Sequence, residues 1–149
     1  MMLYLIIPLI VLLDQATKIL ATNAFLKHGP QEITSFFRLT LIHNTGISLS
    51  LFNDLPSPWI LTTLALLITG FLFYWQATEK NLLIRLTLLL IIGGALGNII
   101  DRIRLGGVVD FLDIHWHEYH WPAFNVADAA VCSGMGLMFI ILIMMRKKT

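Results

Sequence analysis

Two aspartates, Asp110 and Asp128, lie in apolar stretches of the chain, where an unpaired carboxylate is energetically costly. Asp110 lies in "GGVVDFLD", and Asp128 lies in "FNVADAA", just before an uninterrupted apolar run. If two carboxyl groups meet in such surroundings they do not both ionise easily, so one apparent pKa rises and the other falls. Aspartic-protease chemistry has this physical basis, with one group acting as a base and the other as an acid. The two residues are therefore candidates for a catalytic pair.

Further polar residues interrupt the apolar stretches. In "GGALGNIIDR", Asn98 and Arg102 are four residues apart and share a helical face. Asn125 precedes Asp128 by three residues, so this pair also shares a face. Intramembrane polar residues usually face the interior of a helix bundle and mark function. These side chains are candidates to position the carboxyl pair or the substrate backbone, and Arg102 has the alternative role of anchoring its helix at the membrane interface.

Close helix packing and a second charged pair are also indicated. Gly93 and Gly97 form a small-xxx-small pair that lets helices approach closely. Asp14 and Lys18 are four residues apart, so they can pair on one helical face. The only cysteine, Cys132, has apolar neighbours and is expected to be a buried thiol.

A metal site is not expected. The segment "HWHEYH" places His115, His117 and His120 near Glu118, and these residue types are suitable zinc ligands. Their spacing matches no known zinc motif, and the interleaved aromatic residues suit a loop at the membrane interface. We therefore expect neither a metal nor another cofactor.

The composition is that of an integral membrane protein. Of the 149 residues, 57% are hydrophobic and only 13% are charged, whereas a soluble domain has about 25% charged residues. The net charge of +1 gives no support to nucleic-acid binding. The elements that position the candidate residues must therefore be mainly membrane-spanning helices.

The chain is predicted to form one domain, residues 1–149, with an all-α membrane bundle. A spanning helix needs about 20 mostly apolar residues, and the segments that qualify are residues 2–22, 59–77, 82–101 and 124–145. The first connection, residues 23–58, contains "ITSFFRLTLIHNTGISLSLF", whose β-branched and aromatic residues favour strands. We therefore expect four transmembrane helices and a small β-rich periplasmic platform between the first two. The other outer segment is expected at residues 102–123, and a short strand or loop there would present Asp110 inward.

The basic residues predict the orientation. The hinge "TEKNLLIR" carries Lys80 and Arg85, and the chain ends in "RKKT". With four spans, both segments lie on the same side as the N-terminus, and the positive-inside rule makes that side cytoplasmic. A rise of about 1.5 Å per residue then places Asp14 and Asn98 about 20 Å, and Asp128 about 27 Å, from the cytoplasmic ends of their helices. Three helices thus bring polar residues to a similar height in the outer half of the bilayer.

The chain resembles the bacterial lipoprotein signal peptidases, also called signal peptidase II, over nearly its whole length. The matching blocks, in order, are "DQATK", "NTGISLSLF", "GGALGNIIDR", "GGVVDFLD" and "FNVADAA". One departure is in "NTGISLSLF", where Ser48 and Leu49 take the places at which the family commonly has alanine and phenylalanine. Five blocks in the same order make this resemblance specific.

The resemblance implies an intramembrane aspartic endopeptidase with the catalytic pair Asp110 and Asp128. It also marks substrate-binding or supporting residues, namely Asp14, Lys18, Asn44, Gly46, Asn98, Arg102, Asn125 and Ala127. The implied substrate is a prolipoprotein carrying diacylglycerol on a cysteine, cleaved just before that cysteine, and globomycin is the implied inhibitor. The other implied partners are membrane lipids, with no nucleic acid, and the protein is expected to be a monomer. It would lie in the bacterial inner membrane with both termini cytoplasmic and the active site near the periplasmic face.

Two other classes of protein use intramembrane polar residues. One is a small transporter or channel subunit, in which such residues line an ion path. The polar residues here are confined to one half of the bilayer, so they do not make a path across it. The other is an assembly scaffold, in which polar residues join helices. A scaffold should tolerate asparagine at Asp110 or Asp128, whereas a peptidase should lose activity.

Overall fold

The computed structural model describes residues 2–46 and 58–146. The block "NTGISLSLF" therefore lies largely outside the described residues, with only Asn44, Thr45 and Gly46 inside them. The described elements follow one another in the order η1 (Met2–Leu5), α1 (Ile6–His28), β1 (Gln31–Thr34), β2 (Phe37–Asn44), α2 (Pro58–Thr78), α3 (Leu82–Leu105), β3 (Val108–Trp116), β4 (Tyr119–His120) and α4 (Val126–Arg146).

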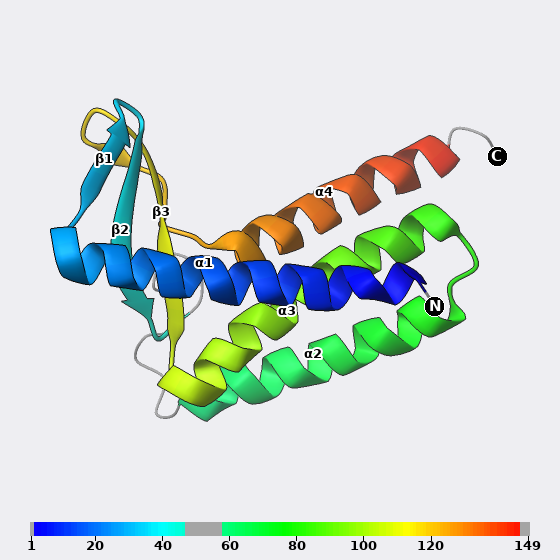
Figure 1. Cartoon of the computed structure of the whole chain (residues 1–149). Helices are drawn as coiled ribbons and strands as arrows, with labels where there is room; N and C mark the ends of the chain where they lie inside the picture. The colour runs from blue at the N-terminus through cyan, green and yellow to red at the C-terminus, as the bar shows by residue number, and fades with distance from the viewer. Residues whose placement is uncertain (1, 47–57, 147–149) are drawn as a thin grey trace.

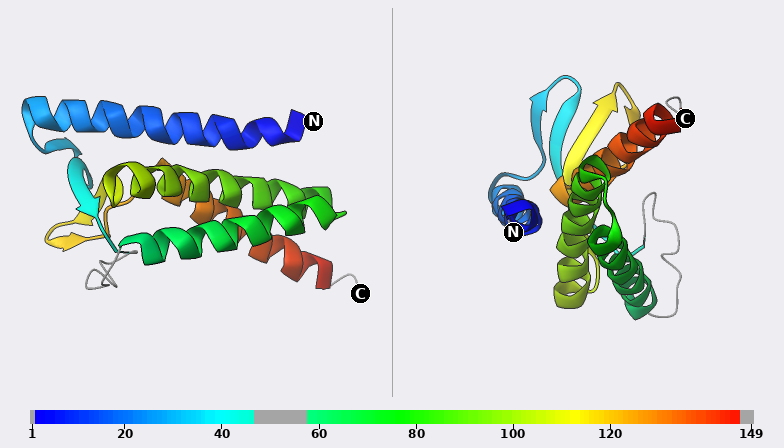
Figure 2. Two further views of the ribbon diagram at one scale, coloured as in Figure 1. Left: turned by 90° about the horizontal axis from the view of Figure 1, so that it is seen from below. Right: turned by 90° about the vertical axis from the view of Figure 1, so that its right-hand side faces the viewer.

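The helices form a membrane-spanning bundle with a small sheet at one end (Figure 1). Among the described residues, four helices are long and apolar enough to cross a membrane, at Leu3–His28, Trp59–Thr78, Leu82–Leu105 and Val126–Arg146. The start of α1, the α2–α3 connection and the end of α4 lie at the end of the bundle opposite the sheet, as Figures 1 and 2 show from different sides. The predicted fold class, four spanning helices with a β-rich platform, is confirmed.

Two helices run further toward the sheet than the sequence predicted. The first continues to His28, where Gly29 takes a positive φ of 70° and donates its N–H to the carbonyl of Phe25. The third continues to Leu105 and ends at Gly106, which has φ 74° and donates to the carbonyl of Arg102. Glycine adopts this left-handed conformation without steric cost, so it commonly ends a helix. Both helices therefore reach the level of the sheet and can supply side chains to it.

The sheet draws its strands from both connections on this side of the bundle. Its order is β1-β2-β3-β4, and all neighbours are antiparallel. The β2–β3 pairing joins the first connection to the second, with Ile42 opposite Asp110 and Asn44 opposite Val108. The platform that the sequence placed between the first two helices thus also includes the strand that carries Asp110. Leu112 pairs in turn with Phe124, which leads into α4.

Helix α3 is the central packing element. Of its most apolar window, 56% is buried inside the protein, more than in any other described span. Leu88, Leu89 and Ile92 are fully buried. A Cβ atom added at Gly94 would lie 2.3 Å from the carbonyl oxygen of Ala127, so α3 approaches the start of α4 as only a glycine allows. This close approach brings Asn98, one turn further along, beside the first turn of α4.

Candidate active site

Asp110 lies on β3 with both carboxyl oxygens held by amide side chains. Asn44, at the end of β2, donates its Nδ2 to Oδ2 at 3.0 Å, and Asn125 donates to Oδ1 at 2.7 Å. The residue is 3% exposed. Amide donors orient a carboxyl group without neutralising it as a lysine or arginine partner would.

Asp128 lies in the first turn of α4 and takes part in a reciprocal cap with Asn125. The Asp128 backbone N–H donates to Asn125 Oδ1 at 2.8 Å, and the Asn125 backbone N–H donates to Asp128 Oδ2 at 3.2 Å. This pairing is the arrangement of a capping box, which satisfies N–H groups left free at a helix start. The other oxygen, Oδ1, accepts a hydrogen bond of 2.7 Å from Asn98 Nδ2 on α3.

Two asparagines connect the carboxyl groups. Asn125 Nδ2 donates to Asp110 Oδ1 and, at 3.2 Å, to Asn98 Oδ1. Asn98 in turn donates to Asp128. A continuous chain of hydrogen bonds therefore runs Asp110–Asn125–Asn98–Asp128, across β3, the start of α4 and α3.

The pKa of Asp110 is raised to about 6, chiefly because burial disfavours the charged carboxylate. The hydrogen bonds from Asn44 and Asn125 and the charge of Lys18 lower this pKa, whereas the negative charge of Asp128 raises it. A carboxyl group in this range can exchange a proton near neutral pH, as acid–base catalysis requires.

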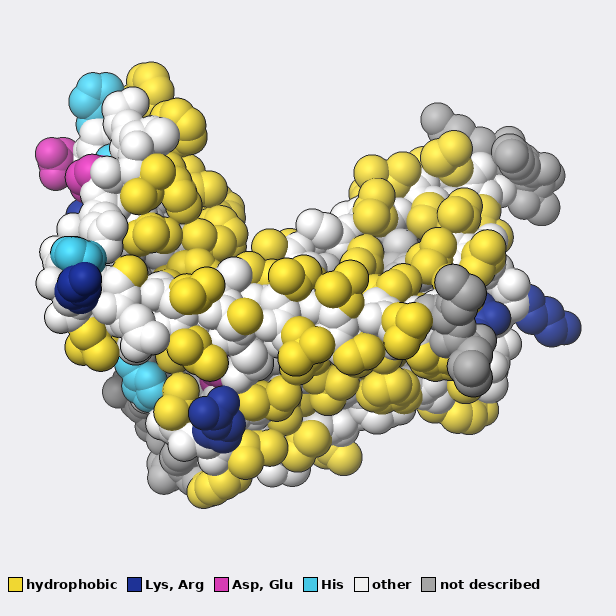
Figure 3. Space-filling model, viewed as in Figure 1, with side chains coloured by type: hydrophobic (Ala, Val, Ile, Leu, Met, Phe, Trp, Pro, Cys, Tyr) yellow, Lys and Arg dark blue, Asp and Glu magenta, His cyan; other side chains and the backbone are white. Residues whose placement is uncertain are grey.

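Both aspartates line one cavity of about 700 Å³. Its polar wall consists of Asn44, Asn98, Arg102, Asp110 and Asp128. Its apolar wall includes Val108, Ile114, Trp121, Pro122, Ala123, Phe124, Ala129 and Cys132. The space-filling view shows a hollow between the sheet and α4 with a largely hydrophobic surface, while acidic, basic and histidine side chains gather on the outer side of the sheet (Figure 3). The cavity thus combines an apolar approach with a polar inner wall.

Arg102 and Cys132 also belong to the cavity wall. Arg102 lines the cavity and donates from Nη2 to the Gly46 carbonyl at 3.2 Å, so it holds the chain just beyond β2. This carbonyl belongs to the protein's own backbone, so both expected roles of Arg102, binding the substrate backbone and anchoring its helix, stay predictions. The expectation that Cys132 is buried was wrong, because its side chain faces outward from α4 into the cavity and is exposed.

Asp14 and Lys18 form the ion pair expected from their spacing, with Nζ 2.8 Å from Asp14 Oδ2. Lys18 also donates to Asn98 Oδ1 at 3.1 Å, directly behind the hydrogen bond from Asn98 to Asp128. The other oxygen of Asp14 accepts the backbone N–H of Ala127 at 2.9 Å. Of the supporting residues predicted from the sequence, Asn44, Asn98 and Arg102 line the cavity. The others are linked to these residues or to the two aspartates by hydrogen bonds and ion pairs.

Asp101 and Gln15 lie next to this ion pair and were not among the site residues predicted from the sequence. Asp101 is 3% exposed and its Oδ2 lies 2.8 Å from Lys18 Nζ. Gln15 donates to Asp14 and, at 2.9 Å, to Asp101. Both residues are inside the quoted blocks "DQATK" and "GGALGNIIDR". The spacing of Asn98 and Asp101, three residues apart on one helical face, was the available signal.

The histidines of the outer hairpin lie away from the cavity, on the polar side of the sheet. His115 contacts Glu32 at 3.2 Å, His120 contacts Asp113 at 2.9 Å, and the two rings stack. Burial alone would raise the pKa of Asp113, but hydrogen bonds from His120 and Arg38 and the charge of Arg38 hold it below its usual range. Within the described ranges, the acidic, cysteine and histidine side chains form no group of three suited to a metal ion.

Fold and site together define a small multi-pass membrane protein with two aspartates on the wall of one cavity. The family model described as "Signal peptidase (SPase) II" matches residues 6–144. The lipoprotein signal peptidase of Teredinibacter turnerae is 45% identical, with 87% of this chain and 80% of the relative covered. That of Syntrophotalea carbinolica is 41% identical, with 93% and 88% covered.

Two solved structures have a similar fold. One described as a bacterial membrane enzyme, obtained by the in meso method at 1.9 Å resolution, superimposes with a TM-score of 0.84 at 30% identity and covers 95% of this chain and 92% of its own. A second, at 2.3 Å resolution, gives a TM-score of 0.80 at 29% identity, with 95% and 87% covered. The chain belongs to the signal peptidase II family of membrane peptidases.

Proposed function

We propose that this peptidase removes the signal peptide from prolipoproteins and that Asp110 and Asp128 are its catalytic pair. The observation that carries the assignment of the pair is their convergence. One comes from a strand and the other from a helix, and both line the same cavity with Asn125 and Asn98 between them. Two carboxyl groups in a partly apolar cavity favour the singly protonated state that general acid–base hydrolysis needs.

In the proposed mechanism the ionised aspartate takes a proton from a water molecule, which attacks the scissile carbonyl. The protonated aspartate donates a hydrogen bond to the carbonyl oxygen, and the pair then delivers a proton to the leaving amine. Asn44, Asn98 and Asn125 hold the four carboxyl oxygens in place, so little reorganisation is needed during the reaction.

The proposed substrate carries a diacylglyceryl group on the cysteine just after the cleaved bond. The wall formed by Ile114, Phe124 and Ala129 is apolar beside the carboxyl pair, so it suits a lipid-modified residue next to a peptide bond. Arg102 on the polar wall of the same cavity can bind a backbone carbonyl or an ester oxygen of the substrate. The enzyme would act as a monomer, surrounded by membrane lipids.

The protein is a multi-pass protein of the bacterial inner membrane. We propose that both termini are cytoplasmic and that the carboxyl pair lies near the periplasmic face. This orientation is supported by Lys80 and Arg146, which lie at the end of the bundle away from the sheet.

The experiment that tests the catalytic pair compares Asp110→Asn and Asp128→Asn with the unchanged protein in a prolipoprotein cleavage assay. We expect each variant to lose about 10³-fold in rate, since each removes a proton donor or acceptor without changing the size of the side chain. Glu118→Gln, at an exposed carboxylate in the β3–β4 turn, is the matched control and should cleave normally. The thermal unfolding temperature would show that all three variants fold.

Cleavage by both folded asparagine variants at the unchanged rate would overturn the assignment. That result would favour a transporter subunit or a scaffold, in which these carboxyl groups join helices rather than react.

A further inference from the structure

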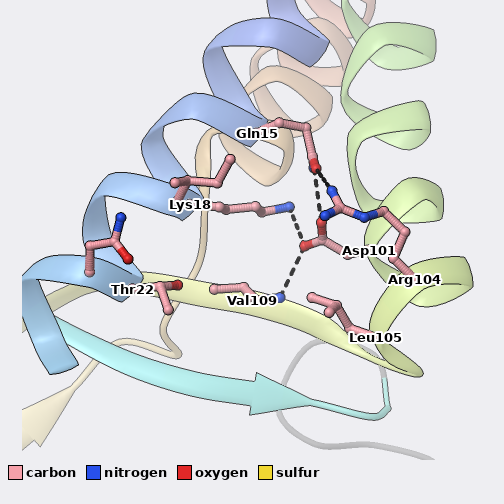
Figure 4. A pocket seen from close by; sticks show the side chains of 9 residues that line it. Gln15, Lys18, Thr22, Asp101, Arg104, Leu105 and Val109 are labelled. Atoms are coloured by element: carbon pink, nitrogen blue, oxygen red, sulfur yellow. Dashed lines mark hydrogen bonds and ion pairs between the residues drawn. The ribbon is translucent and has the colours of Figure 1, made fainter.

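A buried charged cluster, consisting of Asp14, Lys18 and Asp101, lies behind the carboxyl pair. Lys18 Nζ is 2.8 Å from Asp14 Oδ2, 2.8 Å from Asp101 Oδ2 and 3.1 Å from Asn98 Oδ1. These three acceptors match the three N–H donors of an ammonium group. All three charged side chains are at most 4% exposed. Lys18 and Asp101 also border a second, smaller cavity, together with Gln15 and Arg104 (Figure 4).

The two carboxylates of this cluster each hold one backbone amide, and the two amides occupy equivalent positions. Asp14 Oδ1 accepts the N–H of Ala127, the residue directly before Asp128. Asp101 Oδ2 accepts the N–H of Val109, the residue directly before Asp110, at 3.1 Å (Figure 4). Lys18 therefore links two carboxylates. Each of them binds the backbone N–H of the residue directly before Asp110 or Asp128.

The hydrogen bond from Ala127 on α4 to Asp14 on α1 passes beside Gly97 of α3. A Cβ atom at Gly97 would lie 2.7 Å from Asp14 Oδ2 and 3.1 Å from Ala127 Cβ. The Asp14 carboxylate therefore packs against α3 at a position where any side chain larger than that of glycine would collide with it. A Cβ atom at Gly93, one turn away, would meet the side chain of Ile10, with Cδ1 at 2.9 Å and Cβ at 3.0 Å. The two glycines lie on the same α1–α3 contact but only one of them adjoins the charged cluster.

We propose that Asp14, Lys18 and Asp101 are positioning residues that set the separation and orientation of Asp110 and Asp128. The inference rests on the proposed function of that pair. Removing one oxygen from this cluster lets β3 or the start of α4 shift relative to the other. A misplacement of about 1 Å at reacting groups costs about 10²-fold in rate. The effect falls on kcat, because Asp14, Lys18 and Asp101 are not among the residues that line the cavity with Phe124 and Ala129.

The first test compares Gly97→Ala with Gly93→Ala. Both add one methyl group to the α1–α3 contact, and both should lower the unfolding temperature. We expect Gly97→Ala to reduce kcat by about 10²-fold with KM changed less than about threefold, because the added methyl displaces the Asp14 carboxylate from Ala127. Gly93→Ala should keep the kcat of the unchanged enzyme. Equal kcat values for the two variants would overturn the proposal.

The second test removes the other half of the cluster. Asp101→Ala deletes the acceptor for the Val109 amide, and we expect kcat to fall by about 10²-fold. Asp101→Asn keeps one oxygen that can accept from Val109, so it should recover at least about tenfold of the loss. A residue that only stabilised the fold would lower kcat in proportion to the unfolded fraction in both variants. No recovery in the folded asparagine variant would therefore count against positioning.

The alkylation rate of Cys132 by a maleimide serves as an independent check on the cavity. This cysteine is the only one in the chain and lines the cavity beside Asp128. We expect unchanged alkylation in Gly97→Ala and Asp101→Asn, which would show an intact cavity around a misaligned pair. Accelerated alkylation in step with the loss of kcat would mean that the cavity has opened, and would overturn the inference.

The outcomes also separate this inference from the proposed function. If Asp110→Asn or Asp128→Asn retained full cleavage, the function of the pair would fail. If those variants were inactive while Gly97→Ala and Asp101→Ala kept full kcat, only the positioning role would fail.

Discussion

The two carboxyl groups of the site are arranged by asparagines rather than by cations. Asn44, Asn98 and Asn125 each donate to one of the aspartates, and among the described residues neither Asp110 nor Asp128 forms an ion pair with a lysine or arginine. An ion pair would favour the charged form strongly and lower the pKa. The amide donors lower the pKa of Asp110 by less than burial raises it, so the pKa is about 6. The choice of amide partners thus keeps a proton available.

A prediction at this scale concerns Asn44. The hydrogen bond from Asn44 to Asp110 Oδ2 lowers the pKa of Asp110. Replacing Asn44 with leucine removes this bond, so the pKa should rise further above its usual range. We expect the unchanged enzyme to show a limb of the pH–rate profile near pH 6, and this limb should move to higher pH in Asn44→Leu. The measurement is kcat/KM against pH, whose limbs report apparent pKa values of the pair.

The neighbouring variant His43→Gln is the control for this prediction. His43 is exposed and forms no described hydrogen bond to either aspartate. Its pH–rate profile should match that of the unchanged enzyme. A limb that moved to lower pH in Asn44→Leu would mean that the Asn44 amide does not stabilise the charged form of Asp110.

At the scale of elements, α3 organises the site because glycines let its neighbours approach. Gly97 faces Asp14 of α1 and the side chain of Ala127 on α4, whereas Gly94 faces the backbone of α4. The sequence indicated close packing at "GGALG", and hydropathy was enough to predict four helices, because both signals are local. The pairing of β2 with β3 joins residues more than sixty positions apart, and nothing local specifies its register. The contacts of Asp101 with Lys18 and Gln15 likewise join α3 to α1, more than eighty positions away, so Asp101 was missed.

The prediction for the α3–α4 contact uses two glycines. Gly94→Ala places a methyl group 2.3 Å from a backbone oxygen that cannot move alone, so the helices must separate and the unfolding temperature should fall. Gly136→Ala, on α4 where nothing lies within 4 Å, should leave this temperature unchanged or raise it, since alanine stabilises a helix by about 1 kcal/mol relative to glycine. Thermal unfolding in the same detergent compares them, and an equal loss in both would show that α3 and α4 leave room for a methyl group at Gly94.

At the scale of the whole molecule, the polar end and the apolar body are separated along the bundle. The sheet and the carboxyl pair lie at one end, and the α2–α3 connection and the end of α4 lie at the other (Figures 1 and 2). Basic residues are only slightly more concentrated at the second end, so the sequence predicted an orientation from a small bias. The structure makes that bias easier to test because it shows which residues are exposed at each end.

The orientation predicts which end a membrane-impermeant maleimide reaches in intact cells. In a Cys132→Ser background, Glu118→Cys in the exposed β3–β4 turn should be labelled before lysis. Lys80→Cys in the exposed α2–α3 connection should be labelled only after lysis. The reverse pattern would place the carboxyl pair on the cytoplasmic side.

Asn125 has a consequence for how the protein matures. The same side chain starts α4 and binds Asp110, so the hydrolytic centre comes into being only when the last helix of the chain has formed and docked. A nascent polypeptide that has emerged only as far as β3 already carries Asp110 but lacks Asp128 and the Asn125 side chain that binds Asp110. Under the proposed function, a chain that ends before α4 therefore lacks half of the catalytic pair and should not cleave prolipoproteins.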